Sequence, residues 1–86
     1  MPGPRSFRTR RVTLPPGGSR PHHEDEWRGA LIVVESGDLE LLCQAGGSRV
    51  FGTGSVLWFT GLNLASVRNP GPVDTVFRAL TRHHTG

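Results

Sequence analysis

The residues best suited to chemistry gather in one short polar segment, His22-His23-Glu24-Asp25-Glu26. Imidazole and carboxylate groups serve as general acids and bases, and both can also ligate metals. Residues two positions apart on an extended strand face the same side, so His23 and Asp25 are candidates for a hydrogen-bonded pair that acts as general acid or base. The alternative is that both are solvated residues at the rim of the fold. His22 is expected to point to the opposite face of the strand from His23, so the two histidines cannot hold one metal ion together. Only adventitious binding of nickel or zinc is expected at His22 and His23.

The elements around this segment are predicted to be strands. Twelve glycines and seven prolines interrupt the sequence every few residues, which disfavours long helices and favours short strands joined by turns. Apolar patterning predicts seven or eight strands, seven of which are placed at 7–14, 30–35, 39–43, 49–51, 55–59, 62–68 and 73–80. The first of these is expected at a sheet edge. Turn signals about every eight to ten residues are typical of a β-sandwich or barrel.

Composition limits the classes of function. A chain of 86 residues and 9.3 kDa suits one small domain, and a lone cysteine, Cys43, excludes an intrachain disulfide. The ten basic residues are all arginine and the net charge is +3, but these arginines are scattered along the chain, so nucleic-acid binding is not predicted. The sequence lacks both an apolar run that could cross a bilayer and a signal-peptide pattern. We therefore expect a soluble, cytoplasmic protein that does not bind membranes.

Two spaced motifs resemble those of the cupins, a family of small jelly-roll barrels. The first motif, G-x5-H-x-H-x3,4-E-x6-G, matches in spacing at Gly17, His23, Asp25, Ala30 and Gly37. The second, G-x5-P-x-G-x2-H-x3-N, matches in spacing at Gly54, Thr60, Leu62, Ala65 and Asn69. The resemblance spans residues 17–69 and implies an all-β fold, the double-stranded β-helix or jelly-roll barrel.

The resemblance also implies where a metal would be held. In metal-binding cupins two histidines and a glutamate of the first motif and a histidine of the second are the ligands, and these positions are His23, Asp25, Ala30 and Ala65 here. Because alanine has no donor atom, neither a tightly held metal nor another cofactor is predicted. The lumen near Ala30 and Ala65 is expected to be roomy and apolar, which suits an uncharged or amphipathic small molecule.

Strand alternation assigns the faces of the barrel, starting from the position that the resemblance gives to the lost glutamate. Ala30, Ile32 and Val34 are expected to face the lumen, and Leu31 and Val33 to face outward. The predicted ligand-binding residues are Trp27, Ala30, Ile32, Trp58, Ala65 and Arg78. Trp27 is placed at the rim, where it would stack on a ligand, and Trp58 is either core or cavity wall. Arg78 either binds a carboxylate inside the barrel or covers the sheet from outside.

Three functions remain open from the sequence. The leading one is a metal-free cupin-like domain, at residues 7–82 between a flexible lead at 1–6 and a tail at 83–86, that binds a small organic molecule in its lumen. The second is an acid–base isomerase, cyclase or epimerase that uses His23 and Asp25. The third is a closed barrel that acts only as an interaction module. A homodimer is expected, paired through strand 7–14 and the outward residues Leu31, Val33, Leu57 and Phe59.

Overall fold

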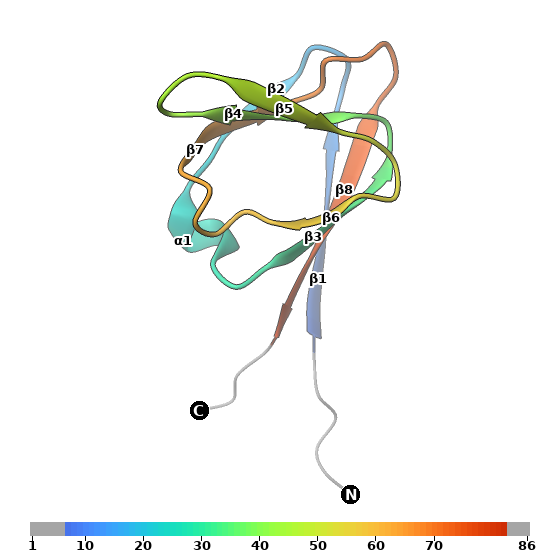
Figure 1. Cartoon of the computed structure of the whole chain (residues 1–86). Coiled ribbons are helices and arrows are strands. Elements are labelled where there is room, and N and C mark those ends of the chain that lie inside the picture. Colours follow the sequence, from blue (N-terminus) through green and yellow to red (C-terminus); the bar gives the residue numbers. More distant parts are fainter. Residues whose placement is uncertain (1–6, 83–86) are drawn as a thin grey trace, which may run out of the picture.

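The structure, a computed structural model, describes residues 7–82, so the lead predicted at 1–6 and the tail predicted at 83–86 lie outside the described residues. Two antiparallel sheets face each other, and one short helix lies at the side where β2 leads into β3 (Figure 1). The elements are β1 (Phe7–Leu14), β2 (Ser19–Pro21), α1 (Glu24–Trp27), β3 (Leu31–Ser36), β4 (Leu39–Cys43), β5 (Ser48–Phe51), β6 (Val56–Trp58), β7 (Leu64–Arg68) and β8 (Thr75–Arg82). The all-β barrel expected from the sequence is confirmed.

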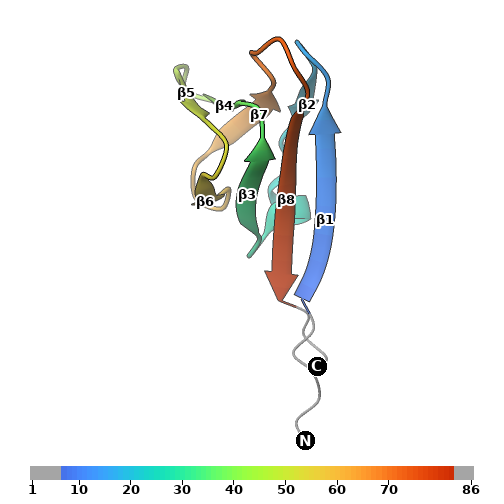
Figure 2. The same ribbon diagram turned by 90° about the vertical axis from the view of Figure 1, so that its right-hand side faces the viewer.

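Each sheet has four strands, in the orders β1-β8-β3-β6 and β2-β7-β4-β5. The first and last strands pair along their whole length, from Phe7↔Arg82 to Leu14↔Thr75. Figure 2 shows these two long strands side by side, with β3 next to β8. The position of β1 at a sheet edge agrees with its sequence. No helix in residues 7–82 is long and apolar enough to cross a membrane.

The interior between the sheets is filled with apolar side chains. Trp27, Phe59 and Phe77 form an aromatic cluster in which ring centroids lie 5.7 to 6.0 Å apart, mostly edge to face. Such pairs add to the free energy gained by burying the rings. The residues that surround the cluster are Val12, Leu14, Ala30, Ile32, Val34, Leu39, Leu41, Leu64, Val67 and Ala79. The predicted inward positions of strand 30–35 are therefore confirmed, and the lumen that they face is packed.

The predicted faces of β6 and the residue after it were wrong. Residues opposite each other on an antiparallel pair share a face, and β6 pairs with β3 as Ile32↔Leu57 and Leu31↔Trp58. Leu57 therefore follows Ile32 and packs against the core, whereas Trp58 follows Leu31 to the outer face, where it is 54 % exposed. Phe59, expected outside, is completely buried.

The segment before β3 was predicted to run directly into the strand, but it forms β2 and α1 instead. β2 pairs with β7, and α1 turns the chain so that Trp27 enters the core. Three acidic residues occupy the first turn of α1, where negative charge is favoured. The helix was not predicted because the segment is polar apart from one apolar residue, Trp27, which is buried.

Two residues of the spaced motifs have structural roles in the loops that join the sheets. Gly37 has φ = 79°, and a Cβ there would lie 2.6 Å from the carbonyl oxygen of Asp74, so only glycine fits this turn. Asn69 is fully buried and its amide nitrogen donates to the carbonyl oxygens of Leu14 and Val73 at 2.9 and 2.6 Å. Its amide oxygen accepts from the backbone N–H of Gly71 at 2.9 Å. Asn69 thus links the end of β1 to the loop between β7 and β8.

Candidate functional site

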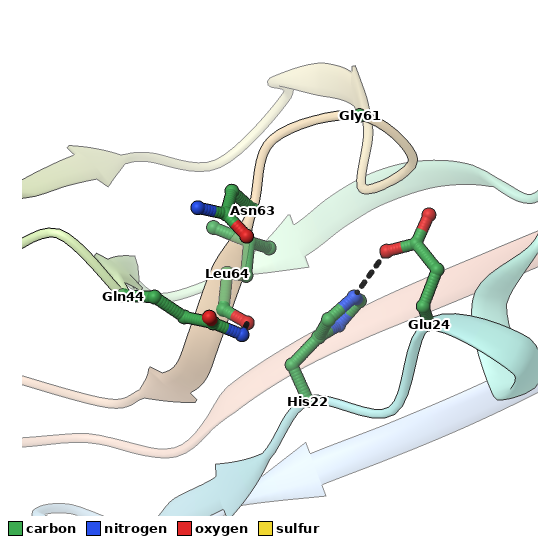
Figure 3. A pocket seen from close by; sticks show the side chains of 6 residues that line it. All are labelled: His22, Glu24, Gln44, Gly61, Asn63 and Leu64. Atoms are coloured by element: carbon green, nitrogen blue, oxygen red, sulfur yellow. Dashed lines mark hydrogen bonds and ion pairs between the residues drawn. The ribbon is translucent and has the colours of Figure 1, made fainter.

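A cavity of about 370 Å³ opens beside α1, where β2, β4 and β7 begin or end. Its six lining residues come from three separate segments and are His22, Glu24, Gln44, Gly61, Asn63 and Leu64. Figure 3 shows His22 and Glu24 on one side and Gln44, Asn63 and Leu64 on the other. We call this cavity the mouth pocket. Five of its six lining residues are polar or glycine, in contrast to the apolar interior beneath it.

His22 is the buried polar group of the mouth pocket, with only 3 % of its side chain exposed. Its backbone N–H donates to the carbonyl oxygen of Ala65 at 3.0 Å, which fixes the residue against β7. Its ring stands edge-on to Phe59, with centroids 5.7 Å apart. The aromatic interior therefore supports the imidazole from behind, and the ring's position depends on that packing.

The hydrogen bond between His22 Nε2 and Glu24 Oε1 is 3.0 Å long. A carboxylate can only accept, so Nε2 carries the ring proton and donates it. The other ring nitrogen, Nδ1, is buried and has no hydrogen-bond partner within residues 7–82. The ring is thus held in one orientation, with its N–H end toward Glu24 and the pocket.

Glu24 supplies the negative charge of the mouth pocket. The hydrogen bond from His22 lowers the pKa of its carboxyl group below the ordinary value. Partial desolvation acts in the opposite direction, but the Gly61 backbone and the charges of His22 and Arg28 lower the pKa further. Glu24 is therefore a carboxylate throughout the neutral range and accepts hydrogen bonds there.

Two amide side chains complete the polar lining. Gln44 Nε2 donates to the backbone oxygen of Leu64 at 3.3 Å, and the Gln44 backbone N–H donates to the oxygen of Asn63 at 3.0 Å. Asn63 adopts φ = 55°, a left-handed conformation that asparagine tolerates better than most residues. These contacts hold the chain ends of β4 and β7 together at the pocket.

The acid–base pair predicted for His23 and Asp25 does not form. His23 is exposed and stands at the N-cap of α1, and Asp25 pairs instead with Arg28 at 2.7 Å, with 91 % of its side chain exposed. The assumption of an extended strand through these residues failed because α1 begins at Glu24. The histidine that faces inward is His22, one position earlier.

The other predicted ligand-binding residues fall into two groups. Trp27, Ala30 and Ile32 do face the interior, but all three are buried in the packed core, and Trp27 is not at a rim. Trp58 and Ala65 lie outside the lumen, so their predicted lumen positions are wrong, whereas Arg78 lies on the outer face, one of the two alternatives left open for it.

Ala65 and Arg78 lie outside the lumen for different reasons. Ala65 is exposed because a register shift between β4 and β7, at Leu42 and Cys43, breaks the simple alternation along β7. Arg78 lies between the buried Phe77 and Ala79, faces outward and bonds to Glu35 at 2.8 Å. Its outer-face alternative is the one that the structure adopts.

The sequence carried one unused signal for the mouth pocket. Arg20 is half-buried between the exposed Ser19 and Pro21 of β2, and continuing that alternation places His22 on the inner side and His23 outside. Nothing in the sequence marked Gln44, Gly61 or Asn63, because turns bring them to the pocket from distant positions.

The donor set at the mouth pocket does not fit a tightly held metal ion. One imidazole and one carboxylate converge there, and the remaining ligand positions implied by the motifs are the alanines 30 and 65. Within residues 7–82 no group of three histidine, cysteine or acidic side chains is gathered closely enough to hold an ion.

Comparison with known proteins places this fold. No protein-family model and no curated protein matches the chain. The Cupin 2 domain of an XRE family transcriptional regulator from Enterobacter cloacae is similar over 93 % of this chain and 83 % of that one, at 26 % identity and a TM-score of 0.64. The chain has the cupin fold.

Two further cupin structures are similar in fold. A Cupin 2 conserved barrel domain protein from Salinispora arenicola has a TM-score of 0.67 and 21 % identity, over 94 % of this chain and 68 % of that one. A cupin domain from Bordetella pertussis Tohama I has a TM-score of 0.66 and 19 % identity, over 98 % of this chain and 88 % of that one. The family resemblance first indicated by the spaced motifs is thereby confirmed.

Proposed function

We propose that this cupin-fold protein binds a small polar organic molecule in the mouth pocket, outside the packed lumen. The observation that carries the proposal is the buried imidazole of His22, held by Glu24 and by the edge of Phe59 with its N–H end toward a cavity. Ligand sites typically combine a preformed concavity with a few fixed polar groups. A volume of about 370 Å³ lies at the lower end of the usual range for such sites, which favours a small metabolite.

The charge of the lining selects the class of ligand. Of the six lining residues, Glu24 is the acidic one, and its lowered pKa keeps it negative at neutral pH. The carboxylate would repel an anionic ligand in the pocket, whereas a hydroxyl, amide or ammonium group would donate a hydrogen bond to it. The side-chain oxygens of Gln44 and Asn63 are further acceptors. The expected ligand is therefore a neutral or cationic molecule with several hydrogen-bond donors.

The apolar guest first expected in the lumen has no space there. Positions 30 and 32 face a core that Trp27, Phe59 and Phe77 fill. Natural cores are close-packed, so a guest among these rings would have to displace side chains. The site for a small molecule is thus shifted outward from the lumen to the polar rim.

Binding is favoured over catalysis by the chemistry of the pair. A carboxylate whose pKa is lowered is a weak base, and the other half of the predicted catalytic pair, Asp25, is committed to Arg28. The similar domain from Enterobacter cloacae is part of a transcriptional regulator, which is consistent with a non-catalytic role for a barrel of this size.

The proposal is tested by saturation-transfer NMR against a panel of small amides, amines, polyols and carboxylic acids. We expect members of the first three classes to bind and the carboxylic acids not to bind. His22→Phe keeps a ring against Phe59 but removes the N–H, and Glu24→Gln removes the charge. Both variants should weaken binding about tenfold, the range for a lost hydrogen bond to a charged group.

The chain supplies a matched control for each variant. His23→Phe and Asp25→Asn make the same chemical changes one residue further along, at exposed side chains outside the pocket. Both controls should bind as the unaltered protein does. Preferential binding of carboxylic acids, equal losses in variants and controls, or no binding from any class would contradict the proposal.

A further inference from the structure

A second cavity, of about 450 Å³, lies between the inner side of the paired strands β1 and β8 and the helix α1. The residues that give it its chemical character are Arg8, Arg10, Asp25, Glu26, Arg28 and Thr81. We call it the arginine groove. It shares no lining residue with the mouth pocket, so the two cavities are separate sites.

The arginines of the groove occupy positions where apolar residues would extend the core. Residues 8, 10, 12 and 14 share one face of β1, and two of them, Val12 and Leu14, are buried between the sheets. Arg8 lies opposite Thr81 on β8, whereas β3 pairs with β8 only as far as Leu80. The inner face thus changes from apolar to basic at Arg10, and Arg8 lies where the β1–β8 ribbon extends past β3.

Arg10 is held in place by two contacts. Its guanidinium bonds to Glu26 at 2.7 Å and lies over the ring of Trp27, 4.8 Å from the centroid. Arg20 bonds to the same carboxylate at 2.6 Å and lies 5.5 Å from the same ring. Because Trp27 is anchored in the core, these guanidinium groups are fixed before any ligand arrives, which lowers the entropic cost of binding.

Positive charge exceeds negative charge around the groove. Arg28 bonds to Asp25 at 2.7 Å, and Glu26 is shared by Arg10 and Arg20. Arg8 adds a fourth guanidinium, exposed at the edge of the groove beside the half-buried Thr81. Three guanidinium groups and two carboxylates therefore line the concavity, and Arg20, which does not line it, bonds to one of those carboxylates.

We propose that the arginine groove binds a small anion through a phosphate or carboxylate group. Guanidinium groups present paired N–H donors that match the oxygens of both groups. Arg8 is assigned as the main anion contact, Arg10 as a pre-positioned second donor, and the Thr81 hydroxyl as a hydrogen-bond partner. The groove thus selects the charge class that the mouth pocket excludes.

The test is a titration of the full chain with inorganic pyrophosphate and, separately, with succinate, followed by backbone amide NMR. Ionic strength is kept constant at about 150 mM, so that diffuse screening does not change during the titration. We expect saturable shifts at Arg8, Arg10 and Thr81 with one or both anions. The tighter-binding anion then shows whether phosphate or carboxylate is the recognised group.

Arg8→Gln should weaken the tighter interaction about tenfold, as loss of a charged hydrogen bond does. The matched control is Arg49→Gln, which removes the same charge from an exposed arginine on β5, in the other sheet. Shifts that do not saturate, or equal weakening in both variants, would overturn the proposal in favour of nonspecific attraction. Groove shifts that appear on concentrating the protein without anion would overturn it in favour of a second chain as the occupant.

Discussion

The aromatic interior and the mouth pocket share two segments of the chain. One segment contributes His22 to the pocket and Trp27 to the interior, and the other contributes Phe59 to the interior and Asn63 to the pocket. The interior is closed and apolar, whereas the pocket is open and polar. The difference indicates that this cupin-fold protein, with alanines at two of the positions that the spaced motifs give to metal ligands, has filled its lumen with rings and keeps its polar groups at the rim.

The two regions are also physically coupled. The ring of His22 stands against Phe59, which is itself in contact with Trp27 and Phe77. A change in the interior should therefore affect both stability and the pocket, whereas a change in the pocket should affect the pocket alone. The following predictions test this asymmetry.

The largest effect is expected from the interior. Phe59→Ala removes a completely buried ring and should lower the free energy of unfolding by about 3–5 kcal/mol, measured by chemical denaturation. Its neighbour Trp58 is the matched control, because Trp58→Ala truncates a larger side chain that is more than half exposed. That variant should change the stability of the monomer by no more than about 0.5 kcal/mol. Similar losses in the two variants would contradict the assigned faces.

A smaller effect is expected from a buried polar residue. Asn69→Ala leaves the carbonyl oxygens of Leu14 and Val73 without their donor, and should cost about 2–3 kcal/mol. The comparison is Asn63→Gly in the mouth pocket, where φ = 55° suits glycine and stability should stay within about 0.5 kcal/mol. Denaturation curves of both variants measure the difference, and an Asn63 loss as large as the Asn69 loss would refute it.

Acid should destabilise the protein through three glutamates. Hydrogen bonding to His22 lowers the pKa of Glu24, and hydrogen bonding to Arg68 and Ser48 lowers that of Glu40. Burial raises the pKa of Glu26, but its bonds to Arg10 and Arg20 outweigh burial and lower it.

A lowered pKa in the folded state means that the stabilisation is complete above the ordinary value of 4.5 and is lost as the pH falls through the folded-state value. Denaturation at pH 7, 5 and about 3 should show equal stability at the first two and a decrease at the last. Glu40→Gln should reduce that decrease. An unchanged stability at about pH 3 would contradict the ion-pair assignments.

The smallest effect on stability is expected from the outer face. Trp58 and Val56 are more than half exposed and lie beside the half-buried Leu31 and Val33. We still expect a homodimer, now paired through this face and not through Phe59. Trp58→Ser should leave the fold intact and shift the mass measured by light scattering from dimer to monomer. A monomer mass for the unaltered chain at micromolar concentration would rule out this expectation.

The sequence predicted the barrel well because turn residues and alternation are local signals. The predicted strand 39–43 has the same bounds as β4, and the predicted inward orientation of Ile32 and Val34 is confirmed. The sequence-based prediction failed where a shift of one residue changes which side chain points inward. The motif spacing selected His23, whereas α1 interrupts the strand there and leaves His22 inside.

Other failures depended on information that one segment does not contain. The register of β6 on β3 decides that Trp58 points outward and Phe59 inward. The exposure of Ala65 follows from a register shift between β4 and β7. The mouth pocket joins three segments of the chain, so its lining residues could be identified only from the tertiary structure.

The most direct test of the account is long-range ¹H–¹⁵N NMR of the histidine rings during titration with the tightest-binding member of the panel. The account predicts that His22 carries its proton on Nε2, and that the Nε2 resonance moves on ligand binding while the His23 ring does not respond. A His22 ring that exchanges between tautomers, or a ligand response at His23 in place of His22, would contradict it.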